Sequence, residues 1–285
     1  MNNITAPVLD RLIELAVMED LSTTGDVTSQ AIFTADATAT AVIKSKEHGV
    51  LAGSYCIEPV YKKIESRIAV KPLLQDGAVV DCESAICLIK GPIRGILSGE
   101  RIALNFIQHL SGIATKTFEM VSLISHTKAL LLDTRKTAPG FRSLEKAAVT
   151  AGGGYNHRMG LFDLILIKDT HVKAAGGPAA AIKKAKSFCG EIRQIKIEVE
   201  VQTIGQFYDA LGESPDIIML DNMSTADMKK CCEYILKENL QVKLEASGKI
   251  NEKTIAETAE SGVDYISSGA ITHSAPALDI HLEIA

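Results

Sequence analysis

Five basic or imidazole side chains gather around glycine-rich turns in the middle of the chain: Arg135, Lys136, His157, Arg158 and Lys168. The whole chain holds 30 Lys and Arg against 35 Asp and Glu, a formal net charge of -5. Clustered cations in an acidic protein favour a small, highly anionic ligand. Guanidinium groups pair with carboxylates and phosphates in bidentate geometry, while lysine supplies a compact charge. The sequence therefore predicts a site for carboxylate or phosphate groups.

Each basic group also has a plainer interpretation. Arg135-Lys136 precedes the turn Pro139-Gly140, which favours a fixed position, although an exposed basic pair fits equally well. Three glycines before His157-Arg158 allow the backbone to approach a ligand closely, or mark a flexible loop. Lys168 ends the apolar run Leu164–Ile167, so we expect a half-buried ammonium. Burial of that charge would require an anionic partner.

Two carboxylates, Glu200 and Asp221, each end an apolar run. They are either counter-ions of the basic cluster or ligands of Mg²⁺, which prefers carboxylate, water and phosphate oxygens. Glu198 shares a face with Glu200 if the strand is regular, because side chains alternate along a strand. From the residues alone, the choice between these two glutamates stays open.

Two turns rich in small residues follow later apolar runs: Ser247-Gly248 and Ser268-Gly269-Ala270. Backbone N–H groups in such turns bind phosphate after the late strands of α/β barrels. Ordinary tight turns would explain either one alone. We expect them to form a phosphate site.

The second half of the chain alternates short β-rich runs with segments long enough for helices. This pattern predicts a parallel sheet. The runs end at polar residues, so their carboxyl ends would meet at one mouth, where α/β barrels place their active sites. Six runs instead of eight predict an incomplete barrel, with strands at 129–133, 164–168, 195–200, 217–221, 242–246 and 265–268.

The first half is organised differently, and the change lies near residue 110. Helical spacing of apolar residues predicts an opening helix over 7–18, and β-rich runs predict strands at 40–46 and 78–89. Residues 93–125 have a helical pattern that Ser111-Gly112 is expected to interrupt.

Composition excludes several classes of protein. Of 285 residues, 46% are hydrophobic, enough for a substantial core, yet no run approaches the roughly 20 apolar residues of a membrane-spanning helix. Residues 1–20 do not have the pattern of a signal peptide, so we expect a cytoplasmic location and no membrane contact. The six cysteines form no CxxC pair, which predicts free thiols. The sequence has no Lys/Arg-rich stripe, which argues against nucleic acid as a partner.

The chain resembles the quinolinate phosphoribosyltransferase family over nearly its whole length. The resemblance rests on motifs that occur together and in order: Gly25–Thr28, Glu100–Asn105, Ser111–Thr115, Asp133–Gly140, Gly152–Arg158, Leu166–Asp169, Glu198–Glu200, Leu220–Met223, Glu245–Gly248 and Ser268–Ser274. It implies an N-terminal α/β sandwich domain (1–110) and an incomplete, open α/β barrel (111–273), the type II phosphoribosyltransferase fold. It also implies that the tail, 274–285, packs back on the first domain.

The resemblance implies Mg²⁺-dependent transfer of phosphoribosyl from phosphoribosyl pyrophosphate to quinolinate, with decarboxylation, in NAD biosynthesis. It assigns quinolinate to Arg135, His157, Arg158 and Lys168, and places Lys136 nearer the phosphoribosyl donor. The phosphates of that donor are then expected at the two small-residue turns, Ser247-Gly248 and Ser268-Gly269-Ala270. The expected catalytic residues are Lys136, Lys168, Glu200 and Asp221, with Glu200 and Asp221 also holding the metal; Glu200 is chosen over Glu198 by the family's spacing to Asp221.

The resemblance further implies a homodimer with shared active sites, in which Arg101 comes from the second subunit; a hexamer, as a trimer of dimers, is a further arrangement. From the sequence alone, Arg101 fits equally well as a surface residue at a helix start. Lys249 and Thr170 depart from the family, standing where glycine and asparagine are more common. Two alternatives are a phosphoribosyltransferase-like protein of molybdenum utilisation and a non-catalytic anion-binding paralogue.

Overall fold

The protein is a mixed α/β structure that divides into two compact units. The computed structural model describes residues 5–190 and 195–285, so the first four residues of the predicted N-terminal domain lie outside the described part. Of these described residues, the first unit comprises 5–118, 137–153 and 271–285, and the second comprises 119–136, 154–190 and 195–270. The predicted boundaries near residues 110 and 273 stay predictions.

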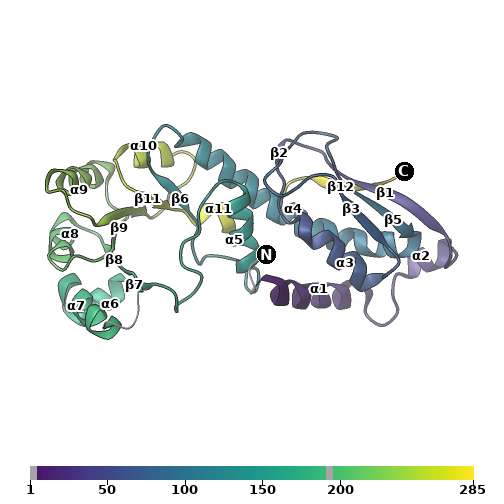
Figure 1. Ribbon diagram of the computed structural model, residues 1–285, viewed down its shortest axis with the longest axis horizontal. Coiled ribbons are helices and arrows are strands. Elements are labelled where there is room, and N and C mark those ends of the chain that lie inside the picture. Colours follow the sequence, from purple (N-terminus) through teal and green to yellow (C-terminus); the bar gives the residue numbers. More distant parts are fainter. Residues whose placement is uncertain (1–4, 191–194) are drawn as a thin grey trace. The chain divides into compact units, whose positions relative to one another are not determined.

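The first unit contains a four-stranded antiparallel sheet of order β12-β1-β5-β3 (Figure 1). Strand β12, from the end of the chain, pairs with β1, placing Leu282 opposite Ile43. A separate two-stranded sheet joins β2 to β4. The strand bounds are β1 Thr38–Ser45, β2 Gly49–Val50, β3 Ala69–Pro72, β4 Val79–Val80, β5 Ala85–Pro92 and β12 Ile280–Ile284.

Helices complete the first unit. The predicted opening helix is α1, which is longer than expected; α3 packs beside it and against β3. Asp26 caps α2 by accepting a hydrogen bond from the Ser29 backbone N–H, at 3.0 Å. The bounds are α1 Thr5–Leu21, α2 Val27–Ile32, the 3₁₀ turn η1 Ser54–Cys56, α3 Ile57–Ile64, α4 Ile93–Leu123 and α5 Arg142–Ala151.

Helix α4 runs unbroken for 31 residues, so the expected interruption at Ser111-Gly112 is wrong. The buried Ser111 hydroxyl accepts a hydrogen bond from the Ala52 N–H and donates one to the Ala52 carbonyl. At Gly112, an added Cβ would lie 1.9 Å from the Pro276 carbonyl oxygen. Both residues are therefore suited to tertiary contacts of a continuous helix, which outweigh their weak helix propensity.

The second unit is built on a six-stranded parallel sheet of order β6-β11-β10-β9-β8-β7. All six predicted strands are present, each within two residues of its expected limits. In the described residues β6 and β7 do not pair with each other, so the barrel is incomplete, as predicted. The bounds are β6 Leu130–Leu132, β7 Ile165–Ile167, β8 Ile197–Val201, β9 Ile217–Asp221, β10 Lys243–Ser247 and β11 Tyr265–Ser267.

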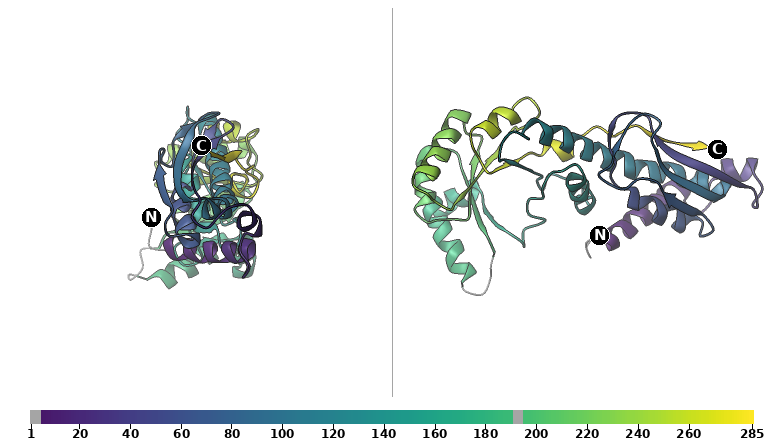
Figure 2. Two further views of the ribbon diagram at one scale, coloured as in Figure 1. Left: turned by 90° about the vertical axis from the view of Figure 1, so that its right-hand side faces the viewer. Right: turned by 45° about the horizontal axis from the view of Figure 1, so that its top comes forward.

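Helices cover the outer side of this curved sheet (Figures 1 and 2). Their bounds are α6 Asp169–Ala175, α7 Pro178–Cys189, α8 Ile204–Leu211, α9 Thr225–Lys237 and α10 Ile255–Glu260. The short helix α11, Ala270–His273, begins at the last residue of this unit and continues into the first unit. Buried aliphatic residues of the central strands, such as Val199, Ile218 and Leu220, form the core. Each strand is thereby held at a fixed depth, which positions the residues that follow it.

Two further expectations concern the whole chain. All six cysteines are free thiols, as predicted. No helix in the described residues combines the length and the apolar character needed to cross a membrane.

Candidate active site at the carboxyl ends of the parallel strands

A cavity of about 380 Å³ opens at the carboxyl ends of the six parallel strands. Every strand from β6 to β11 supplies lining residues, either from its last three positions or from the loop that follows it. The lining residues are Thr134, Arg135, Lys136, His157, Arg158, Leu166, Lys168, Glu200, Met219, Asp221, Asn222, Ser247, Gly248, Lys249 and Ser267. The structure thus brings together most of the predicted site residues in one cavity.

Two guanidinium groups and two ammonium groups of the predicted set line this cavity. Arg158 donates a hydrogen bond from Nη1 to the Leu164 carbonyl oxygen at 3.2 Å. Burial lowers the pKa of Arg158, and the nearby charge of Arg135 lowers it further. Two neighbouring arginines in a partly buried site favour an anion between or beside them.

Lys168 lies at this cavity, but it is exposed, so the expected half-burial is wrong. Strand β7 ends at Ile167, and Lys168 is already the N-cap residue of α6. Its backbone N–H donates to His171 Nδ1 at 2.9 Å, which fixes the turn. Because the ammonium is exposed, water can solvate its charge, and it does not need an anionic partner within the protein. Its place beside the cavity supports ligand binding instead.

Glu200 and Asp221 form an acidic part of the wall of the same cavity. Glu200 accepts a hydrogen bond from the Asp169 N–H at 3.3 Å, and Asp221 accepts one from the Gln202 side-chain amide at 3.2 Å. Burial raises the pKa of Glu200, and the nearby Asp221 carboxylate adds to the rise, while Lys168 opposes it. Two carboxylates that repel each other at a cavity wall are a donor set that suits a hard cation such as Mg²⁺.

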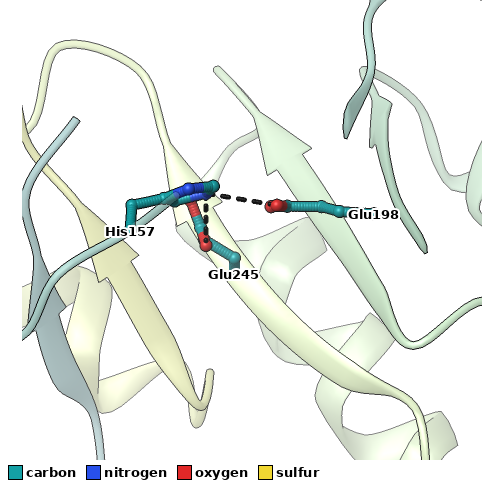
Figure 3. Close-up of side chains that lie close together, drawn as sticks. All are labelled: His157, Glu198 and Glu245. Atoms are coloured by element: carbon teal, nitrogen blue, oxygen red, sulfur yellow. Dashed lines mark ion pairs between the residues drawn. The ribbon is translucent and has the colours of Figure 1, made fainter. Parts of the chain in front are cut away.

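Sequence analysis did not recognise one cluster as a unit, namely His157, Glu198 and Glu245 (Figure 3). His157 lines the cavity, and the two glutamates are buried behind it. His157 Nε2 lies 3.1 Å from a Glu198 oxygen and 3.5 Å from a Glu245 oxygen. Both glutamates are 0% exposed. We call these three residues the floor, and Glu200 with Asp221 the wall.

The floor carboxyls are in an environment that disfavours their charge. Burial raises the pKa of both, and the Glu198 carboxylate raises that of Glu245 further, to about 8. Glu198 and Glu200 share a face of β8, as expected, but only Glu200 lines the cavity. Glu245 was not among the predicted site residues. Its sequence signal is a charged residue inside an apolar strand, between Leu244 and Ala246.

The turns after β9 and β10 interlock at one side of the cavity. The Asn222 N–H donates to the Ser247 carbonyl at 2.9 Å, and a Cβ on Gly248 would lie 2.4 Å from Asn222 Oδ1. Lys249 adopts a left-handed φ of 54°, which costs about 1 kcal/mol in a residue other than glycine. This conformation explains why glycine suits the position, and Lys249 brings a further cation to the cavity.

The second predicted phosphate turn, Ser268-Gly269-Ala270, follows β11 but is not part of the cavity lining, where Ser267 stands instead. The Ser268 hydroxyl donates to the Ile250 carbonyl at 2.7 Å and accepts a hydrogen bond from the Ala270 N–H at 3.2 Å. Ser267 donates to the Ser247 hydroxyl at 3.1 Å, which links the two turns. A phosphate-binding role for Ser268, Gly269 and Ala270 stays a prediction.

Arg101 lies on α4, in the first unit, and is exposed. It does not line the cavity described above. Thr170, the other departure from the family, lies in the first turn of α6, where its N–H donates to the Asp169 side chain at 2.7 Å.

Comparison with known proteins covers almost the whole chain. Residues 26–111 match the model of the quinolinate phosphoribosyl transferase N-terminal domain, and residues 113–283 match that of its C-terminal domain. A probable nicotinate-nucleotide pyrophosphorylase (carboxylating) of Bacillus subtilis is 39% identical over 276 residues, 97% of this chain and 93% of the relative. A mitochondrial quinolinate phosphoribosyltransferase (decarboxylating) of Nicotiana tabacum is 39% identical over 289 residues, which cover 97% of this chain and 82% of the relative.

Solved structures agree with these sequence matches. The nicotinate-nucleotide pyrophosphorylase of Francisella tularensis superimposes with a TM-score of 0.93 at 40% identity, covering 100% of this chain and 98% of the other. NadC of Streptococcus pyogenes gives 0.92 at 35% identity, covering 100% of both chains. The likeness extends over both units and confirms the expected fold class.

Proposed function

This chain belongs to the quinolinate phosphoribosyltransferase family, enzymes of NAD synthesis, and we propose from that premise that it converts quinolinate and phosphoribosyl pyrophosphate to nicotinate mononucleotide, pyrophosphate and CO₂. The observation that carries the proposal is the cavity, which is lined both by the cations of Arg135, Arg158 and Lys168 and by the carboxylates of Glu200 and Asp221. A dicarboxylate and a pyrophosphate ester need both kinds of group.

The cations bind the ring acid. Quinolinate carries carboxylates on adjacent ring carbons, so Arg135 and Arg158 each pair with a carboxylate, and Lys168 adds a compact charge at the edge of the cavity. His157 completes this side of the cavity. Several charged contacts orient the ring so that its nitrogen lies next to the donor sugar. Because the two reactants are already aligned, the activation free energy of the transfer no longer includes the entropic cost of aligning them.

The wall and the turns bind the phosphoribosyl donor. Lys136 and the Ser247-Gly248 turn contact its phosphates, together with the Ser268-Gly269-Ala270 turn. Glu200 and Asp221 would hold Mg²⁺, which, when bound with pyrophosphate, supplies positive charge for the leaving group.

The chemistry requires no covalent nucleophile from the protein. The bond between the ribose carbon and pyrophosphate breaks as the bond from that carbon to the ring nitrogen forms. The carboxylate next to the ring nitrogen then leaves as CO₂. Its electron pair stays on the ring carbon, where the cationic nitrogen stabilises it, and a proton from solvent replaces it. The role of the cavity is therefore positioning and electrostatic stabilisation.

The direct test measures CO₂ and pyrophosphate from purified protein given ¹⁴C-carboxyl-labelled quinolinate, phosphoribosyl pyrophosphate and Mg²⁺. We expect release of both products in equal amounts, dependent on all three components. Binding of both substrates without product would instead identify a non-catalytic anion-binding paralogue.

We further propose, from the family resemblance, a homodimer in which Arg101 completes the partner's cavity. Arg101→Ala and Lys168→Met homodimers should each be nearly inactive. After subunit exchange, a mixed dimer holds one undamaged site, so activity should recover to roughly a quarter of wild type under random reassortment. No recovery after exchange demonstrated by mass spectrometry would place Arg101 in its own subunit's site, or in none.

A further inference from the structure

The floor adjoins the cavity and has the composition of a metal site, with one imidazole and two carboxylates whose ligand atoms all lie within 4.8 Å of one another. Glu198 comes from β8 and Glu245 from β10, with β9 between them. Strands two apart are about 10 Å apart in a sheet. Their carboxyls nevertheless converge on His157, as Figure 3 shows.

The hydrogen bonds of His157 argue against a metal at this place. Its Nδ1 accepts a hydrogen bond from the Arg158 backbone N–H at 2.7 Å. Nδ1 therefore has no proton, and the ring must carry its proton on Nε2. Nε2 faces the two glutamates, 3.1 Å from a Glu198 oxygen and 3.5 Å from a Glu245 oxygen, so its N–H points toward their carboxyls and it has no lone pair for an ion. A metal-bound histidine has the opposite arrangement, in which the second nitrogen donates.

The same imidazole connects the floor to the cavity. Its Nδ1 contact fixes the peptide that leads into Arg158, and the His157 N–H donates to buried Asp133 at 2.8 Å. Beyond that peptide, the Arg158 guanidinium is tied to the Leu164 carbonyl and lines the cavity. Rotation of the His157 ring would remove the acceptor for the Arg158 N–H and release this segment.

Burying two carboxyls has a cost that apolar residues at the same positions would avoid. Glu245 lies between Leu244 and Ala246, both buried, so an aliphatic side chain would suit the strand. A residue that lowers the stability of the fold and lies next to a binding cavity is explained if it has a role in that site.

We propose that Glu245 is a positioning residue which, through the Nε2–H of His157, fixes the Arg158 guanidinium for one carboxylate of the ring acid. This inference rests on the proposed function for the identity of the ligand, but not for the arrangement of the floor. Glu198 makes the shorter contact, but it stands two residues before Glu200 on β8. Glu245 is therefore the residue through which the floor can be changed separately from the wall.

The test compares Glu245→Leu with Glu245→Gln. Gln keeps a polar side chain of the same size beside His157 and Glu198, whereas Leu fills the space without a polar group. We expect Glu245→Leu to raise the KM for quinolinate about tenfold while the KM for phosphoribosyl pyrophosphate stays within about twofold. Glu245→Gln should stay within about threefold of wild type for both.

Thr258→Val is a matched control, because it also replaces a buried polar group of this unit, on α10 and away from the cavity. It should change neither KM. Equal rises in both KM values for Glu245→Leu, or no rise, would overturn the proposal. So would failure of Glu245→Gln to retain quinolinate affinity while its fold is intact.

A second measurement needs no substrate. In ¹⁵N-arginine spectra, the guanidinium signals of Arg158, assigned by their loss in Arg158→Lys, should show hindered rotation in wild type and Glu245→Gln. Glu245→Leu should abolish it. Unchanged Arg158 signals in Glu245→Leu would overturn the positioning role even if the protein turns over quinolinate. Absence of turnover in wild type would refute the proposed function alone, and the spectra would still decide the role of Glu245.

Discussion

Glu198 and Glu200 stand two residues apart on one strand, share a face and carry the same chemical group, yet they lie in different surroundings. Glu198 is fully buried in the floor, whereas Glu200 is partly exposed at the cavity wall. The wall carboxylates are accessible to a ligand or a metal ion, while the floor carboxyls contact an imidazole. Depth within one sheet therefore separates two roles for the same side chain, as differing environments do for paired catalytic carboxyls generally.

The wall should show the largest effect on activity. Asp221→Asn removes a negative charge from the proposed Mg²⁺ site, so kcat/KM should fall about 100-fold or more, with a raised Mg²⁺ requirement. The affinity for phosphoribosyl pyrophosphate should fall more than that for quinolinate, as measured by calorimetry with Mg²⁺ present. Asp209→Asn, an exposed carboxylate on α8, is the control. A larger effect on quinolinate would contradict the assignment of Asp221.

Removing a cation from the cavity should have the next largest effect. Lys168→Met should weaken quinolinate binding tenfold or more, since a charge-assisted contact is worth about 1.5 to 3 kcal/mol. Binding of phosphoribosyl pyrophosphate should change by only a few-fold. Lys184→Met, exposed on α7, serves as control. Unchanged quinolinate affinity would remove Lys168 from the site.

The floor should affect the pH dependence of stability. An unfolded glutamate loses its proton near pH 4.5, whereas Glu245 in the folded state holds its proton up to about pH 8. Between these values the folded state binds more protons, so the free energy of unfolding should fall as pH rises, by up to about 1.4 kcal/mol per pH unit for one proton.

Glu245→Gln should reduce that slope in urea unfolding measured from pH 5 to 8. Glu233→Gln, an exposed glutamate on α9, should leave it as in wild type. If both variants retain the wild-type slope, another group must be its source.

The smallest effect is expected at Lys249, which faces the cavity in a strained conformation. Lys249→Gly relieves the left-handed backbone but adds freedom to the unfolded chain, for a net gain of about 0.5 to 1 kcal/mol. Loss of the cation should weaken phosphoribosyl pyrophosphate binding roughly three- to fivefold. Chemical unfolding and calorimetry check the two effects. A loss of stability would show that contacts of Lys249 outweigh its backbone strain.

The parallel sheet was predictable because its strands are short, strongly apolar and separated by helical segments. The polar ends of those strands also indicated the cavity. The floor was less accessible to prediction, since Glu198 and Glu245 meet only through the strand order β10-β9-β8. The exposure of Lys168 depends on the residue at which β7 ends and α6 begins, and element boundaries are the least reliable part of a sequence prediction.

The continuity of α4 is a second feature that the sequence did not predict correctly. Ser111 and Gly112 are poor helix formers by local propensity, so the sequence favoured a break. The hydroxyl of Ser111 bonds to Ala52, and Gly112 fits against Pro276, more than 160 residues further along the chain. Local rules fail where distant contacts determine which small residue fits.

The pairing of β12 with β1 has a consequence for how this protein is made. During synthesis, residues 38–45 leave the ribosome long before their partner, residues 280–284, which lies more than 230 residues further along the chain. Until then, one side of β1 exposes unpaired N–H and C=O groups, the kind of edge at which chains aggregate. All six strands of the parallel sheet are synthesised before that edge is covered. The nascent chain must therefore protect β1 until residues 280–284 are made, and deletion of that strand would leave the edge open permanently.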